Sequence, residues 1–119
     1  SCVTLATAPL VRGAWLGSGT HLDLVGGFTP SMRETDGDCL RLARVWVDTA
    51  EALSKAGDIL QAVAEGAFDP AGTQGTLADL CRGAGGRCTA DEVTLFKSVG
   101  TALEDLAAAE LVFDGSERC

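Results

Sequence analysis

Apolar and polar residues alternate in two short stretches near the start of the chain, and each stretch ends at proline or glycine. Residues 2–11 have the sequence CVTLATAPLV, in which Val3 and Leu5 fall on one face. Residues 20–27, THLDLVGG, alternate leucine with polar residues until two glycines follow. A period of two residues is typical of β-strands, so the pattern predicts a short strand in each stretch.

Two later stretches are continuously apolar, as expected of strands covered on both faces. They are residues 45–47, VWV, within a strand predicted over residues 43–47, and residues 93–96, VTLF. Helical patterns separate the strands. Asp36 or Asp38 caps a short helix ending at Leu42, Thr49 opens a helix that Gly57 closes, and two further short helices are predicted over residues 61–66 and 76–82. Loops or single turns are predicted at residues 13–19, 68–75 and 82–87.

The last helix has two possible starts. Ser98 could cap it, or Thr101 could, with Glu104 completing a capping box. Either helix runs to Phe113 with an apolar stripe that requires a partner. If the helix starts at Thr101, the hydroxyl and amide of Ser98 are expected to be free to face a ligand.

The predicted order is β, β, α, β, α, α, α, β, α. Strands alternating with helices favour a parallel sheet, here of about four strands, flanked by helices. A doubly wound domain normally opens with a strand and a glycine-rich phosphate turn, but no G-x-G-x-x-G occurs in this sequence. The chain begins inside a predicted strand, so we expect the upstream half of a larger domain to be missing.

Composition and charge narrow the classes of partner. The 119 residues suit one domain, and the formal net charge of −8, with no basic stripe, disfavours nucleic acid. No apolar run is long enough to cross a membrane, and no basic region precedes the first strand, so the expected location is the cytoplasm. The five cysteines lack paired spacing, so we expect free, mostly buried thiols and no metal site.

Two candidate sites, one for hydrolysis and one for calcium binding, are better explained as structural features. His21 and Asp23 share a strand face, but no nucleophile elbow accompanies them, so hydrolysis is disfavoured. Residues 33–38, RETDGD, lack the ligand ladder of a calcium loop and are interpreted as a solvated acidic loop.

The strand exits at residues 4–7, 25–27 and 97–100 carry small residues. Small residues there would let the backbone come close to a bound ring or ribose, but they would equally allow tight turns. The composition does not decide between these two interpretations.

Four ordered blocks resemble the ornithine cyclodeaminase/mu-crystallin family. They are VTLATAPLVRGAWLGSGTHLDLVGGFTPSMRETD, VWVDT, AGDIL and ADEVTLFKSVGTALEDLAAA, and the resemblance spans about residues 2–113. It implies that residues 1–113 are the C-terminal part of an NAD(P)-binding Rossmann-like domain with a helix returning toward a second domain, and that residues 114–119 are a tail.

The resemblance also implies site residues. Thr4 and Leu5 would touch the nucleotide, Val25 would lie beside the nicotinamide, and Ser98 of the K-S-x-G block would lie near the same ring. Gly26 and Phe28 would line the substrate. Cyclodeaminases of the family carry an aspartate where this chain has Phe28, and the GFTPSMRE stretch is more similar to bacterial reductases of pyrroline-2-carboxylate or piperideine-2-carboxylate.

We therefore expect the C-terminal part of an NAD(P)H-dependent ketimine reductase that acts on a cyclic imino acid or amino acid. Because the family's phosphate turn and its substrate-binding lysine and arginine lie upstream, this chain alone is expected to be inactive and to bind no cofactor tightly. Two alternatives stay open. One is a non-catalytic binding or self-assembly module, pairing with itself or with a complementing N-terminal half; the other is an ornithine cyclodeaminase proper. The substrate, the choice between NADH and NADPH, and the oligomeric state are undetermined.

Overall fold

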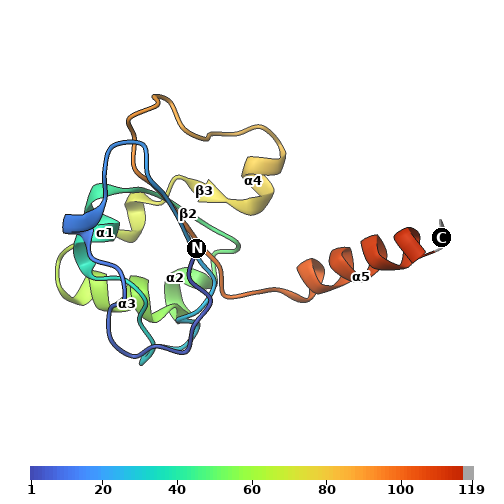
Figure 1. The fold of residues 1–119 in the computed structure, drawn as a ribbon, viewed down its shortest axis with the longest axis horizontal. Helices are drawn as coiled ribbons and strands as arrows, with labels where there is room; N and C mark the ends of the chain where they lie inside the picture. Colours follow the sequence, from blue (N-terminus) through green and yellow to red (C-terminus); the bar gives the residue numbers. More distant parts are fainter. Residues whose placement is uncertain (117–119) are drawn as a thin grey trace.

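Four parallel strands form a single sheet in the computed structural model, which describes residues 1–116 (Figure 1). The strands are β1 (His21–Leu24), β2 (Arg44–Val47), β3 (Gly75–Thr76) and β4 (Thr94–Lys97), in the order β1-β4-β2-β3. Every neighbouring pair is parallel, so the predicted fold class is confirmed. The two-residue β3 lies where the sequence predicted the end of a loop and the start of a helix.

The strand predicted within residues 2–11 is reduced to two isolated parallel bridges, one between Cys2 and Leu24 and one between Val11 and Thr35. The amide of Thr4 donates to a side chain, Glu34, instead of to a strand, and the carbonyl of Ala6 accepts from the amide of Arg33. The backbone of this segment is therefore bonded to a loop, which is why the alternation of Val3 and Leu5 does not produce a ladder.

The predicted cap at Asp36 is confirmed, whereas the predicted cap at Thr49 is wrong: the helix that it was expected to open starts after Glu51, with no side-chain cap. The helices are η1 (Gly13–Trp15), α1 (Gly37–Leu42), α2 (Ala52–Lys55), α3 (Gly57–Ala64), η2 (Pro70–Gly72), α4 (Leu77–Cys81) and α5 (Ala102–Ser116). Asp36 caps α1 through the amide of Cys39, and Thr76 forms a full capping box with Asp79 on α4. Gly57 starts α3 instead of merely closing α2. A Cβ there would lie 1.9 Å from the carbonyl oxygen of Met32, so the glycine permits close packing.

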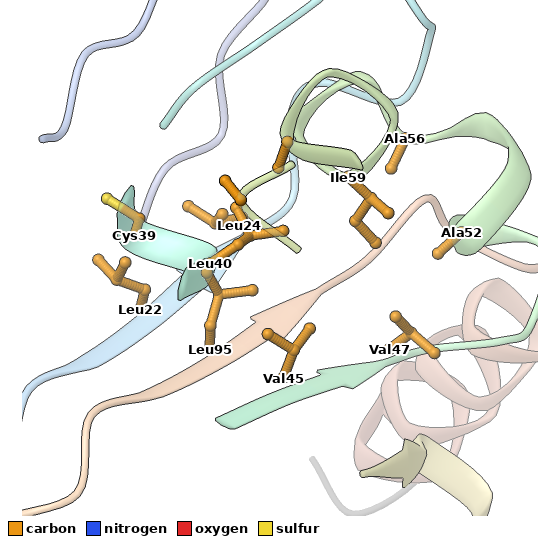
Figure 2. Packing of buried hydrophobic residues seen from close by; sticks show 12 residues of the cluster. Leu22, Leu24, Cys39, Leu40, Val45, Val47, Ala52, Ala56, Ile59 and Leu95 are labelled. Atoms are coloured by element: carbon orange, nitrogen blue, oxygen red, sulfur yellow. The ribbon is translucent and has the colours of Figure 1, made fainter. Parts of the chain in front are cut away.

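The apolar core lies on one face of the sheet, beneath α1, α2 and α3 (Figure 2). Register places Leu22, Leu95 and Val45 in one row across the strands on this face. The opposite face carries Trp46 and Phe96. Gly86 and Arg87, in the loop of residues 82–87, lie beside these two side chains. The core side chains of Figure 2 include Leu24, Cys39, Leu40, Val47, Ala52, Ala56 and Ile59.

Helix α5 projects away from the sheet and its other helices (Figure 1). Thr101 and Glu104 form the predicted capping box, so the helix starts after Thr101 and not at Ser98. It continues to Ser116, past the expected end at Phe113. Its large apolar side chains are all exposed: Leu103, Leu106, Leu111, Val112 and Phe113.

The cysteine prediction is partly correct. Four cysteines are free, as predicted, but only Cys39 is buried; Cys2 is half-buried, and Cys81 and Cys88 are exposed. The fifth, Cys119, lies outside the described residues. In the described part of the chain, no cluster of three or more His, Cys, Asp or Glu side chains is placed to hold a metal ion. No helix within residues 1–116 is both long and apolar enough to span a bilayer.

Candidate functional site

Three turns meet at the carboxyl edge of the sheet. Strands β1, β4 and β2 end in register at Leu24, Lys97 and Val47. The turns that follow, residues 25–28, 98–100 and 48–49, therefore leave the sheet side by side. In open parallel α/β sheets, ligands bind beyond this edge.

The turn after β1 is fixed through its backbone and exposes its larger side chains. The amide of Val25 donates to the carbonyl of Cys2 at 2.8 Å. A Cβ on Gly26 would lie 2.2 Å from the carbonyl oxygen of Thr4, and Gly27 adopts a left-handed φ of +62°. Val25 is 40% exposed and Phe28 45% exposed. The turn thus offers two apolar side chains from a rigid backbone.

Thr4 and Leu5 lie in the segment beside this turn. The amide and hydroxyl of Thr4 both donate to Oε1 of Glu34, at 2.7 and 2.8 Å. Leu5 is 71% exposed. Thr4 is consequently held in place, while Leu5 offers an apolar side chain to solvent.

Ser98 is held by Asp48, so the expectation that its hydroxyl and amide are free is wrong. Its hydroxyl donates to Oδ2 of Asp48 at 3.1 Å, and its amide donates to the carbonyl of Leu24 at 2.9 Å. Oδ2 of Asp48 also accepts from the amides of Val99 and Gly100, each at 2.7 Å. A ligand that approaches here meets a rigid turn in which the serine proton is already committed.

Lys97 is the least expected residue of the edge, because the sequence analysis assigned it no role. Its side chain is fully buried, and its ammonium donates to the carbonyls of Gly26 and Leu24, the latter at 3.4 Å. Nζ also lies 3.5 Å from Oδ2 of Asp58, a carboxylate that is itself buried. Burial lowers the pKa of the Lys97 ammonium, and the carboxylates of Asp58 and Glu34 oppose that shift.

Asp58 and Glu34 extend this buried polar network. Oδ1 of Asp58 accepts from the amides of Glu34 and Thr35, both at 2.8 Å, and from the hydroxyl of Thr35 at 3.0 Å. Glu34 in turn holds Thr4. One chain of contacts therefore runs from the turn after β1, through Lys97, Asp58 and Glu34, to Thr4.

The interpretation of residues 33–38 as a solvated loop is wrong for its first half. Glu34 and Thr35 are fully buried and Arg33 is nearly so. The Arg33 guanidinium donates to the Thr35 carbonyl and pairs with Glu65, which raises the pKa of Arg33 and lowers that of Glu65. No local pattern in the sequence marks this burial, because Glu34, Asp58 and Lys97 become partners only in the folded chain.

His21 and Asp23 do share a face, but nothing there forms a triad. Nδ1 of His21 lies 2.9 Å from the hydroxyl of Thr94, and Asp23 accepts from the hydroxyl of Ser1. A cavity of about 310 Å³ lies against this face of the sheet, lined by His21, Trp46, Leu80, Gly86, Arg87, Thr94 and Phe96. Arg87 is occupied by the carbonyls of Gly19 and Ala90, so it braces the loop.

The carboxyl edge exposes three large apolar side chains. Exposed Val25, Leu5 and Phe28 suit contact with flat or apolar groups, and a Cβ on Gly100 would meet nothing within 4 Å. Lys97, at the end of β4, is fully buried, and the sequence contains no G-x-G-x-x-G phosphate turn.

A parallel sheet with three turns at its carboxyl edge places the chain in the class of Rossmann-like, dinucleotide-binding α/β folds. The chain belongs to the ornithine cyclodeaminase/mu-crystallin family, whose pattern matches residues 1–118.

Relatives and a solved structure are similar along nearly the whole chain. A pyrroline-2-carboxylate reductase of Colwellia psychrerythraea is 42% identical, over 95% of this chain and 36% of the relative. The ketimine reductase mu-crystallin of Mus musculus is 39% identical, over 94% of this chain and 34% of the relative. The solved structure of a Thermococcus litoralis pyrroline-2-carboxylate reductase with NADH and L-proline matches with a TM-score of 0.87. Its sequence is 37% identical, and the match covers 97% of this chain and 36% of that chain. The chain spans about a third of the length of these relatives.

Proposed function

We propose that residues 1–113 form the later part of the cofactor-binding domain of a cytoplasmic, NAD(P)H-dependent ketimine reductase. One observation carries this proposal: the turn after β1 exposes Phe28, at a position where the family resemblance implies a proton-exchanging aspartate in cyclodeaminases. Phenylalanine cannot exchange a proton, so the turn suits reduction of an imine better than elimination of ammonia. The similarity to pyrroline-2-carboxylate and ketimine reductases supports the same choice.

Each residue of the edge has a proposed role. Thr4 and Leu5 would contact the nucleotide, Val25 would lie against the nicotinamide, and Ser98 would provide a polar contact near that ring. Gly26 and Phe28 would line the cyclic imino acid. NAD(P)H, when bound, supplies the hydride, while these residues orient the reactants and exclude water. The buried partners of Thr4 and Ser98, Glu34 and Asp48, keep both residues in fixed positions.

The direct test is an assay of the full-length protein encoded with this sequence. Pyrroline-2-carboxylate and piperideine-2-carboxylate should each be reduced with loss of NADPH or NADH absorbance, whereas ornithine should release no ammonia. A Phe28→Asp variant serves as the matched control for the turn and should lose reductase rate. Ammonia release from ornithine by the wild-type protein, without imine reduction, would show an ornithine cyclodeaminase instead.

The isolated 119-residue chain should neither reduce imines nor bind NADPH tightly. The physical reason is that Lys97, at the end of β4, is fully buried and that the sequence contains no glycine-rich phosphate turn. Calorimetric titration of the chain with NADPH checks this expectation. Tight binding would contradict it and would require a phosphate site elsewhere in the chain.

A second candidate function is a non-catalytic binding or assembly module. The observation that favours it is α5, whose Leu103, Leu106 and Phe113 are 77%, 54% and 64% exposed. An apolar helix face of this kind is usually covered by a second copy or by another part of the protein. Light scattering on the chain alone, with a Leu103→Glu/Leu106→Glu variant as control, distinguishes self-association from a monomer.

A further inference from the structure

We propose that Lys97 is a positioning residue of the candidate site: by binding the carbonyls of Leu24 and Gly26 and pairing with Asp58, it fixes the turn of residues 25–28. The inference rests on the proposed function, which assigns this turn to the nicotinamide and the imine. Lys97 itself touches neither, because its side chain is fully buried. It would act through the backbone of Gly26.

The position of Lys97 in the sheet makes a lysine there unusual. Register sets it between Leu24 and Val47, on the face that carries the apolar core. Buried ion pairs are often no more stabilising than apolar side chains of similar volume, because desolvation offsets the attraction between the charges. Stability alone therefore gives little reason for a lysine at this point. Its contacts with the turn after β1 give a better one.

The same ion pair is linked through Asp58 and Glu34 to Thr4, the residue proposed to contact the nucleotide. Asp58 holds the backbone of Glu34 and Thr35, and Glu34 holds Thr4 through its amide and hydroxyl. A Cβ on Gly27 would lie 2.4 Å from Oδ2 of Asp58, which shows how closely the turn packs on the acid. A change at Lys97 should consequently shift the turn and the Thr4 segment together.

The test compares the two lysines of the chain in the full-length protein. Lys97→Met keeps the length of the side chain and removes its charge and donors. Lys55→Met is the matched control, because Lys55 is exposed and forms its ion pair with the equally exposed Glu51. Misplacement of reacting groups by about 1 Å can cost about 10²-fold in rate, so kcat for imine reduction should fall by about that factor in Lys97→Met, with a much smaller change in the KM for NADPH. Lys55→Met should be unchanged.

A double variant separates positioning from stability. Lys97→Met/Asp58→Asn removes both charges while leaving an oxygen that can accept from the amides of Glu34 and Thr35. Its melting temperature should recover relative to Lys97→Met, but its kcat should stay low because the turn has lost its anchor. Recovery of kcat together with the melting temperature would overturn the proposal. If Lys97→Met alone does not fold, the double variant carries the kinetic comparison with wild type.

Hydrogen exchange provides a readout that needs no activity. Peptides covering residues 22–28 should exchange faster in the double variant and in Lys97→Met than in wild type or Lys55→Met. Unchanged exchange in these peptides would overturn the positioning role, whatever the kinetics. If the wild-type protein reduces no imine but the exchange effect is present, the proposed function fails while the anchoring of the turn by Lys97 stands.

Discussion

Lys97 and Asp58 form an ion pair in which both side chains are almost completely removed from solvent, with Nζ 3.5 Å from Oδ2. The other ion pairs found within residues 1–116 each have at least one partner that is substantially exposed or only half-buried. Loss of one partner from a buried pair leaves an uncompensated charge, whereas loss of an exposed pair costs little.

Asp58→Ala should therefore lower the free energy of unfolding by roughly 3–5 kcal/mol, because it strands Lys97 and removes an acceptor from the amides of Glu34 and Thr35. Glu51→Ala, which removes the exposed partner of Lys55, is the matched control and should change it by less than about 0.5 kcal/mol. Urea denaturation followed by circular dichroism measures both. Equal effects of the two substitutions would contradict the structure.

Asp48→Ala should release the turn after β4. Four donors converge on this carboxylate: the hydroxyl of Ser98 and the amides of Thr49, Val99 and Gly100. Hydrogen bonds to a charged group contribute about 1.5–3 kcal/mol each, and losses at one acceptor overlap, so we expect destabilisation on the order of 3 kcal/mol.

Asp114→Ala on exposed α5 is the control for Asp48→Ala and should leave the unfolding midpoint unchanged. Amide exchange distinguishes a local from a global effect, because residues 98–100 should lose protection first. Protection that is retained at these amides in Asp48→Ala would show that the carboxylate does not organise the turn.

Alkaline pH should destabilise the fold through Cys39. Burial, followed by the hydrogen bond with Asp36, raises the pKa of this thiol from 9.0 to about 12. Above pH 9 the unfolded chain loses this proton and the folded chain keeps it, so stability from Cys39 is present below pH 9 and is lost as pH rises toward 12. At about pH 10.5 the loss should be about 2 kcal/mol.

Comparing the pH dependence of wild type and Cys39→Ala isolates this contribution. The variant is expected to be less stable at neutral pH, because it loses a buried side chain, but to lose less stability between neutral and alkaline pH. Cys81→Ala, at an exposed thiol, should follow the wild-type curve. Parallel curves for wild type and Cys39→Ala would contradict the raised pKa.

Two glycines should respond oppositely to alanine. Gly26→Ala places a Cβ within 2.6 Å of three atoms of Thr4 and Glu34, so the N-terminal segment must move, at a cost of about 1–3 kcal/mol.

Gly115→Ala adds a Cβ to exposed α5 with nothing within 4 Å. It should increase the helicity of α5 and stabilise the helix by up to about 1 kcal/mol. Thermal melting and the helical circular dichroism signal separate the two effects. A stable Gly26→Ala protein with an unshifted Thr4 amide resonance would contradict the close packing.

The sequence determined the elements whose causes are local. Helix caps at Asp36, Thr76 and Thr101 and the apolar strands β2 and β4 follow from side chains within a few residues of one another. The alternation of strands and helices was enough to predict a parallel sheet with a carboxyl edge, while the family resemblance implied Thr4, Val25 and Ser98 as candidate site residues there.

Tertiary structure decided which polar groups are buried, and no local pattern contains that information. Lys97, Asp58 and Glu34 lie far apart in the sequence and become partners only when β4, α3 and the loop before α1 pack together. Each would be costly to bury alone, so their burial depends on long-range pairing. For the same reason the N-terminal alternation did not produce a full strand: the backbone of Thr4 found a side-chain acceptor, Glu34, that only the folded chain supplies.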